Sequence, residues 1–457
     1  MNLWAEFENE QPGQAQGTVP TGSTGLARKQ KLTQGRRLTE RAILSSLREW
    51  LLRDYVAPYC RSLAGTRIFR RCFWIDGLGT AMLEPVARVS EELMKEDKPI
   101  ALRGILLGTG SSKRKGSKTA EVEDDGRRAG FSLPKESGSV GASWLEIAED
   151  VLEFLDQSPA IFLLNPFGQT LFTYDDLAPL YTRTAPTEVC ILISHKQLEM
   201  RVIPSLRASV SGATFALEKV QVKDEGANPS TTPAGDHKGN KAAPHSSQPP
   251  SPLRNRGEQV GNGAVAVELT SLLRSDRWKG LVSKEVGVEE VVDGIIDLLI
   301  ASMKGHFLAV VPIELPVQVW PAVVERAPYT LIFATRRQDS LVCMNDAVCL
   351  HRRGLYEESL RGVLTEDWFM RQRREHLDEE IRQLYGRTLE KGRTQRARRW
   401  PDLRQQLMLA HFGQFTLDDY DEVICKLLLN SEVRCEWRQR LASEGRIPGN
   451  EDTLIWK

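Results

Sequence analysis

Two apolar segments that end abruptly in polar and glycine residues constrain the fold most. Residues 72–79 read CFWIDGLG, and residues 160–168 read AIFLLNPFG. Near-continuous apolar runs of this length are typical of parallel strands that are buried on both faces. In open α/β sheets the ligand crevice lies outside the carboxyl ends of the strands, which is where these segments place Asp76 and Asn165. The sequence therefore predicts a cofactor-binding α/β fold.

Helical patterns alternate with strand patterns along most of the chain. Apolar residues recur at helical spacing from residue 43 to residue 55, ahead of the first strand. Helices are also expected at residues 86–94 and 144–156, and further strands at 99–107 and 189–194. This alternation predicts a Rossmann-like, mostly parallel sheet with helices on both faces.

Composition divides the chain into four parts. Segments rich in Gly, Pro, Ser and Gln bury too little apolar surface to offset the entropy of ordering. We expect a disordered tail over residues 1–38, an α/β domain over 39–365, a charged connecting helix and basic linker over 366–399, and a winged-helix domain over 400–457. Within the α/β domain, the insertions at residues 108–143 and 223–263 are expected to be disordered.

The overall charge and the cysteine pattern exclude several classes of protein. The formal net charge of the 457 residues is +0, so any attraction to nucleic acid must be local. Seven cysteines without CxxC spacing favour neither a disulfide framework nor a metal site. No apolar run approaches 18 residues, and the first residues lack the pattern of an export signal. We therefore expect a cytoplasmic protein that does not contact a membrane.

The first predicted strand ends in a glycine-containing turn that is a candidate cofactor site. Gly77 and Gly79 permit positive φ angles and a close approach of the backbone to a ligand. The Asp76 carboxylate can accept hydrogen bonds from a ligand ammonium or hydroxyl group. Asp76, Gly77 and Gly79 are the predicted cofactor-binding residues, although a tight turn without a ligand explains the same pattern equally well.

The Asn-Pro-Phe sequence after the second segment is a candidate catalytic site. The Asn165 amide oxygen and the Pro166 carbonyl can hold an exocyclic amine by its hydrogens, while Phe167 stacks on a base. This arrangement predicts methyl transfer to an amino group. The alternative is an Asn-Pro turn with Phe167 in the core. His195, after a later strand, is a weaker candidate.

The C-terminal part of the chain carries a local basic patch. Helices are expected at residues 403–412, 417–429 and 433–442, followed by a β wing over residues 446–457, which is a winged-helix order. The predicted nucleic-acid-binding residues are arginines of the linker and of the third helix: Arg393, Arg396, Arg398, Arg399, Arg434 and Arg438. A solvated linker, or a winged helix that contacts only protein, remains an alternative.

Six segments in this order resemble the bacterial three-Cys-motif partner proteins, a family with a methyltransferase-like domain followed by a winged helix. The segments are residues 47–55, 74–77, 162–168, 187–189, 329–335 and 344–346. The resemblance implies an S-adenosylmethionine-dependent methyltransferase that acts on an amino group of a nucleic-acid base, either DNA or RNA, together with a partner protein.

The chain departs from the pattern of this family at three places. Asn165 replaces the usual Asp, Gly77-Leu78-Gly79 replaces Phe-Ala-Gly, and residues 105–108 end a strand without the acidic residue that would hold the cofactor ribose. The alternative to an enzyme is therefore a catalytically degenerate scaffold that binds nucleic acid or a partner protein through its winged helix.

Overall fold

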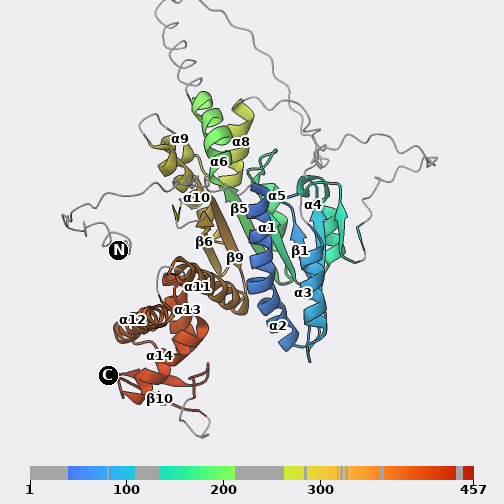
Figure 1. The fold of residues 1–457 in the computed structure, drawn as a ribbon. Coiled ribbons are helices and arrows are strands. Elements are labelled where there is room, and N and C mark those ends of the chain that lie inside the picture. Colours follow the sequence, from blue (N-terminus) through green and yellow to red (C-terminus); the bar gives the residue numbers. More distant parts are fainter. Residues whose placement is uncertain are drawn as a thin grey trace, which may run out of the picture. The chain divides into compact units, whose positions relative to one another are not determined.

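A seven-stranded sheet forms the centre of the computed structural model, which describes residues 40–79, 82–108, 133–134, 136–210, 262–282, 286–315, 318–319, 323–324, 328–360, 365–438 and 446–457 (Figure 1). The tail expected over residues 1–38 lies outside these residues, as does nearly all of the insertion expected over 223–263.

The strand order of the sheet is β3-β2-β1-β4-β5-β9-β6. The first five strands run parallel, and β9 runs antiparallel to both of its neighbours. The strands are β1 (Arg71–Asp76), β2 (Ala101–Leu107), β3 (Gly138–Val140), β4 (Ala160–Leu164), β5 (Thr187–Ser194), β6 (Ala309–Leu315) and β9 (Tyr329–Thr335). A two-stranded ribbon of β7 (Gln318–Val319) and β8 (Val323–Val324) follows β6. The mostly parallel sheet predicted from sequence is confirmed.

The strand order reverses between β1 and β4. From β1 the chain first adds β2 and β3 on one side, and then adds β4 and β5 on the other. Asp76 at the end of β1 is in register with Leu163 of β4. Such a reversal opens a crevice at the carboxyl ends of the strands, because the connections on its two sides leave in opposite directions. The two segments that led the sequence analysis therefore end side by side.

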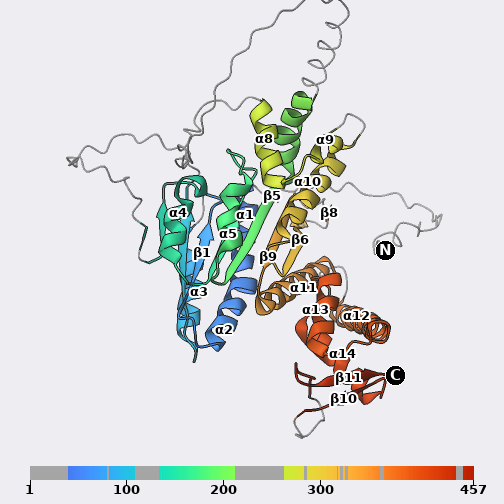
Figure 2. The same cartoon turned by 180° about the vertical axis from the view of Figure 1, so that it is seen from behind.

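Alternating side chains of the strands feed two separate hydrophobic cores, one on each face of the sheet. On β1, Trp74 packs into one core and Phe73 into the other. Helices cover both faces (Figures 1 and 2). The Trp74 face is covered by α1 (Glu40–Trp50), the π-helical turn η1 (Leu51–Val56), α2 (Ala57–Gly65), α3 (Glu84–Met94) and α11 (Gln338–Leu360). The Phe73 face is covered by α4 (Trp144–Leu155), α5 (Tyr174–Thr182), α6 (His195–Gln197), η2 (Leu198–Val202), α8 (Asn262–Leu273), α9 (Trp278–Leu281) and α10 (Val288–Met303).

The end of the first expected insertion is ordered, so the prediction for residues 108–143 is wrong there. Residues 138–140 form β3, which pairs in parallel with the end of β2. The Gly108 amide donates to the Val140 carbonyl at 2.9 Å. A strand of three residues, Gly-Ser-Val, is too short to give an alternating pattern that sequence analysis can detect.

The third helix was expected over residues 433–442, but the first four of these residues form a strand. Residues 433–436 form β10, which pairs antiparallel with β11 (Thr453–Trp456), and residues 439–445 lie outside the described residues. Val433 is buried and Arg434 is exposed, as the pleat of a strand requires. The helices before this hairpin are α12 (Glu366–Gln395), α13 (Trp400–Ala410) and α14 (Leu417–Leu429). The hairpin therefore follows α14 directly (Figure 2).

Two adjacent residues of α11 hold the loop between α13 and α14. The buried Asn345 amide accepts a hydrogen bond of 2.9 Å from the Gly413 backbone N–H and donates one of 2.7 Å to the Phe415 carbonyl. Asp346 accepts from the Leu417 backbone N–H at 2.9 Å. Trp400 of α13 and Tyr420 of α14 belong to the same hydrophobic core as α1 and α11. The C-terminal helices are therefore packed and hydrogen-bonded onto α11.

The described residues were also searched for membrane-spanning helices and for metal sites. No helix in the described part of the chain is both long and apolar enough to span a membrane. Among the same residues, no three His, Cys, Asp or Glu side chains gather closely enough to hold a metal ion.

Candidate functional site

The sheet brings the two predicted sites together at its carboxyl edge. Asp76 ends β1, and Asn165 directly follows β4, the neighbouring strand. Gly108 follows β2 on the other side of β1. These three strand ends therefore lie where a doubly wound fold binds a nucleotide-type cofactor.

The Asp76 carboxylate is fully engaged by a residue that the sequence analysis missed. Arg48 of α1 donates from Nε to Asp76 Oδ2 at 2.6 Å and from Nη2 to Oδ1 at 3.3 Å. The Leu78 backbone N–H also donates to Oδ1, at 3.0 Å. The Asp76 side chain is 0% exposed and that of Arg48 is 8% exposed. No oxygen of this carboxylate faces solvent in the structure.

Arg48 also fixes the glycine turn. Its Nη2 donates to the Gly79 carbonyl at 2.7 Å, so one guanidinium binds both ends of the turn. A sequence signal for this role exists, because Arg48 lies on the same helical face as Leu44, Leu47 and Leu51, which point into the core. A charged residue within such an apolar stripe indicates a buried partner, since unpaired charges are not buried.

Packing explains both glycines of the turn. A Cβ atom on Gly77 would lie 2.7 Å from Leu164 Cδ2, and the Gly77 N–H donates to the Leu163 carbonyl at 2.8 Å. Gly79 has a φ of +69°, a conformation that favours glycine. The turn against β4 thus favours glycine at both positions without any ligand.

The Asn-Pro-Phe segment is also engaged internally. Asn165 Oδ1 accepts from the Phe167 backbone N–H at 3.0 Å, and Nδ2 donates to Gln197 Oε1 at 2.9 Å. The Pro166 carbonyl accepts from the Phe172 N–H at 2.9 Å. The Phe167 side chain is 1% exposed and belongs to the core that Phe73 enters. In this geometry its ring offers no free face to a base, so its assignment as a catalytic residue stays a prediction that the packing does not favour.

The end of β2 is covered by the chain that follows β3. Gly108 donates its N–H to the carbonyls of Val140 and Ala142, both at 2.9 Å. A Cβ atom on Gly108 would lie 3.0 Å from the Gly141 carbonyl carbon. No carboxylate stands at Leu107 or Gly108, where a ribose would require one. With Asp76 held by Arg48 as well, the described residues do not fit S-adenosylmethionine in the manner that the family resemblance implies.

His195, the weaker candidate, directly follows β5 and is hydrogen-bonded to a residue of the neighbouring strand β9. It is 9% exposed, and its Nε2 lies 2.8 Å from Thr330 Oγ1 of β9. This geometry is that of a buried structural histidine.

The predicted arginines of the C-terminal part divide into two groups. Arg393 donates to Glu432 at 2.7 Å and to the Lys457 carbonyl at 2.6 Å, and Arg438 forms an ion pair with Glu451. The other four arginines are exposed, and within the described residues none lies in ion-pair distance of a carboxylate: Arg396, Arg398, Arg399 and Arg434. Only this second group is free to bind an anion.

The outward face of α14 is not basic. Its exposed positions include Asp418, Glu422 and Lys426, and Leu429 is 76% exposed. Acidic side chains repel phosphate, so this helix is poorly suited to lie in the groove of a nucleic acid.

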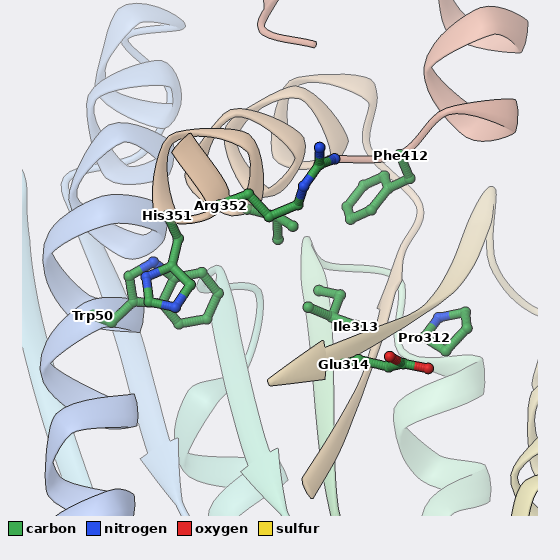
Figure 3. Close-up of a pocket in the computed structure, with 8 residues that line it drawn as sticks. Trp50, Pro312, Ile313, Glu314, His351, Arg352 and Phe412 are labelled. Carbon is green, nitrogen blue, oxygen red and sulfur yellow. The ribbon is translucent and has the colours of Figure 1, made fainter. Parts of the chain in front are cut away.

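A small cavity of about 180 Å³ lies at the edge strand β6, apart from all of these residues (Figure 3). Trp50 and His351 form one wall, with ring centroids 5.4 Å apart, and Phe412 forms another (Figure 3). Burial lowers the pKa of His351. None of the residues predicted from sequence lines this cavity.

Comparison with known proteins identifies no relative of the chain. No protein-family model, no curated protein and no solved structure matches it.

Proposed function

We propose that this protein is a methyltransferase-type scaffold in which the cofactor position is closed, and that it acts by binding nucleic acid or a partner protein. The observation that carries this proposal is the Arg48–Asp76 ion pair. It uses both oxygens of the carboxylate that a cofactor would need, and it ties the glycine turn to α1. An ion pair buried this deeply is costly to open, because each charge would be left without its partner.

Two further observations support a closed site. The Gly108 backbone N–H, just after β2, is hydrogen-bonded to residues 140–142, and this strand end carries no acidic side chain that could bind a ribose. Phe167, which an amino-group methyltransferase would use for stacking, is buried in the core. Each of the three strand ends at the crevice is therefore satisfied by the protein itself.

The C-terminal elements are the proposed binding unit. Three helices, α12 to α14, precede the β10–β11 hairpin, which supports a winged-helix-like arrangement with α14 as its last helix. This arrangement differs from the sequence expectation, in which residues 433–442 supplied the last helix. Exposed arginines gather on the hairpin and on the segment between α12 and α13.

An active methyltransferase is the second candidate. The strand order is compatible with it, because the order reverses between β1 and β4, where an open α/β sheet binds its ligand. The position of Asn165 directly after β4 favours it as well.

Transfer of a labelled methyl group from S-adenosylmethionine to DNA and RNA separates the two candidates. A closed scaffold is expected to transfer no more label than its Asn165→Ala variant. Transfer by the wild-type protein that Asn165→Ala abolishes, with folding intact, would establish the enzyme and refute the scaffold.

A further inference from the structure

The outer face of the β10–β11 hairpin carries an exposed arginine. Val433 and Cys435 of β10 turn inward, so Arg434 turns outward, opposite Ile455 of β11. Ile455 is 42% exposed, which confirms that this side of the hairpin faces solvent.

The segment before α13 extends this face on the far side of β11. The Leu454 backbone N–H donates to the Arg398 carbonyl at 2.8 Å, and Trp456 Nε1 donates to the Ala397 carbonyl at 2.7 Å. The segment 397–398 therefore lies beside β11. Arg398 and Arg434 belong to two segments that are both hydrogen-bonded to β11.

The charges on this surface are predominantly positive and are not neutralised internally. Arg396 and Arg399 are exposed beside Arg398, and Glu436 is the exposed carboxylate next to Arg434 on β10. The paired arginines Arg393 and Arg438 contrast with them, because each already binds a glutamate.

We propose that the arginine face of the hairpin, formed by Arg396, Arg398, Arg399 and Arg434, binds the phosphate backbone of a nucleic acid. This inference rests on the proposed function and specifies its ligand and its orientation. Exposed guanidinium groups suit a phosphate backbone, because each can donate two parallel hydrogen bonds to one phosphate. The acidic outer face of α14 excludes the usual reading of the groove by the last helix, so the hairpin is the contacting element.

Point variants are needed for the test, because truncation before α13 would remove core residues. Trp400, Leu403 and Tyr420 pack in the same core as α1 and α11. The test variant is the full chain with Arg398→Gln and Arg434→Gln. The matched control is Arg61→Gln with Arg88→Gln, which removes the same two positive charges from exposed positions on α2 and α3.

The measurement is fluorescence anisotropy of labelled single-stranded DNA, duplex DNA and single-stranded RNA, over about 50 to 200 mM salt. Wild type and control are expected to bind at least one of these probes, with affinity that falls steeply as salt rises. The test variant should bind more weakly, and its slope of log affinity against log salt should be smaller by about one unit per arginine.

Three results would overturn the proposal. Equal binding by the test variant and the wild type would show that these arginines make no phosphate contacts. Absence of salt-dependent binding to all three probes would exclude a nucleic acid, and tighter binding of a polyglutamate peptide would identify an acidic protein segment as the ligand. None of these results depends on whether S-adenosylmethionine binds, so the closed cofactor site is tested separately.

Discussion

The Arg48 guanidinium lies 2.6 Å from the Asp76 carboxylate, and this buried pair joins α1 to the end of β1. Its two residues are 28 positions apart in the sequence. The pair ties α1 to the turn that follows β1.

Replacing Arg48 by Met should destabilise the protein strongly. Removing one partner of a buried ion pair leaves the other charge unpaired, which costs about 3–5 kcal/mol. The comparison variant is Arg88→Ala, which removes exposed pairs with Glu84 and Glu49 and should cost less than about 1 kcal/mol. Urea unfolding followed by circular dichroism measures both, and similar midpoints for the two variants would contradict the structural role of Arg48.

A second prediction concerns Gly77. Gly77→Ala places a Cβ atom 2.7 Å from Leu164 in a packed core, and overpacking of this kind costs about 1–3 kcal/mol. Gly141→Ala is the control, because no atom lies within 4 Å of a Cβ atom at that position. If thermal unfolding shows no difference between the two variants, close packing does not explain the glycine turn.

Sequence analysis found the sheet but not the ion pair, and the reasons are physical. Strands such as residues 160–164 are short, continuous apolar runs with sharp ends, a pattern typical of buried parallel strands. Arg48 pairs with a residue far along the chain, and the only local signal is its position in an apolar helical stripe. A strand of four residues shows too few alternating buried and exposed positions to be recognised. The sequence of residues 433–436 also fits one face of a helix, so the sequence predicts a helix there.

The glycines and the Asn-Pro-Phe segment show a different limit of sequence analysis. Gly77 and Gly79 fit a cofactor turn and a tight structural turn equally well, and the fold adds that Leu164 packs against Gly77 and that Gly79 has a positive φ. The sequence around Phe167 fits a stacking residue and a core residue equally well, and its burial favours the core. The chemistry predicted at such positions therefore needs the fold before it can be weighed.

A third prediction concerns the buried carboxylate of Glu188 on β5. Tyr59 donates to it at 2.7 Å and Ser340 at 2.8 Å, and burial raises its pKa to about 7. Because the folded protein holds this proton more tightly than the unfolded chain, whose group titrates near 4.5, the contribution to stability is present below pH 4.5 and is lost as pH rises through 7. The change is about 1.4 kcal/mol for each unit of difference between the two pKa values.

Glu188→Gln should remove this dependence, because the amide does not titrate. The free energy of unfolding, measured between pH 5 and pH 8 for both proteins, is expected to fall more for the wild type than for the variant. Parallel curves would show that Glu188 does not titrate in this range.

A fourth prediction concerns Asn345 of α11. Asn345→Ala leaves the Gly413 N–H and the Phe415 carbonyl without partners, and each such buried group costs about 1–3 kcal/mol. The exposed Asn430, which donates to the Tyr385 hydroxyl at 3.1 Å, is the control, and Asn430→Ala should cost less than about 1 kcal/mol. Differential scanning calorimetry should show a lower melting temperature for the Asn345 variant alone. Equal melting temperatures would mean that Asn345 does not hold the C-terminal helices.

Calorimetric titration of the purified full-length protein with S-adenosylmethionine tests the closed cofactor site most directly. A closed site predicts no heat of binding from wild-type protein that is folded by circular dichroism. Micromolar binding by the wild type would contradict the closed site, and its loss in an Asp76→Ala variant that is still folded by circular dichroism would identify the crevice as a working cofactor pocket.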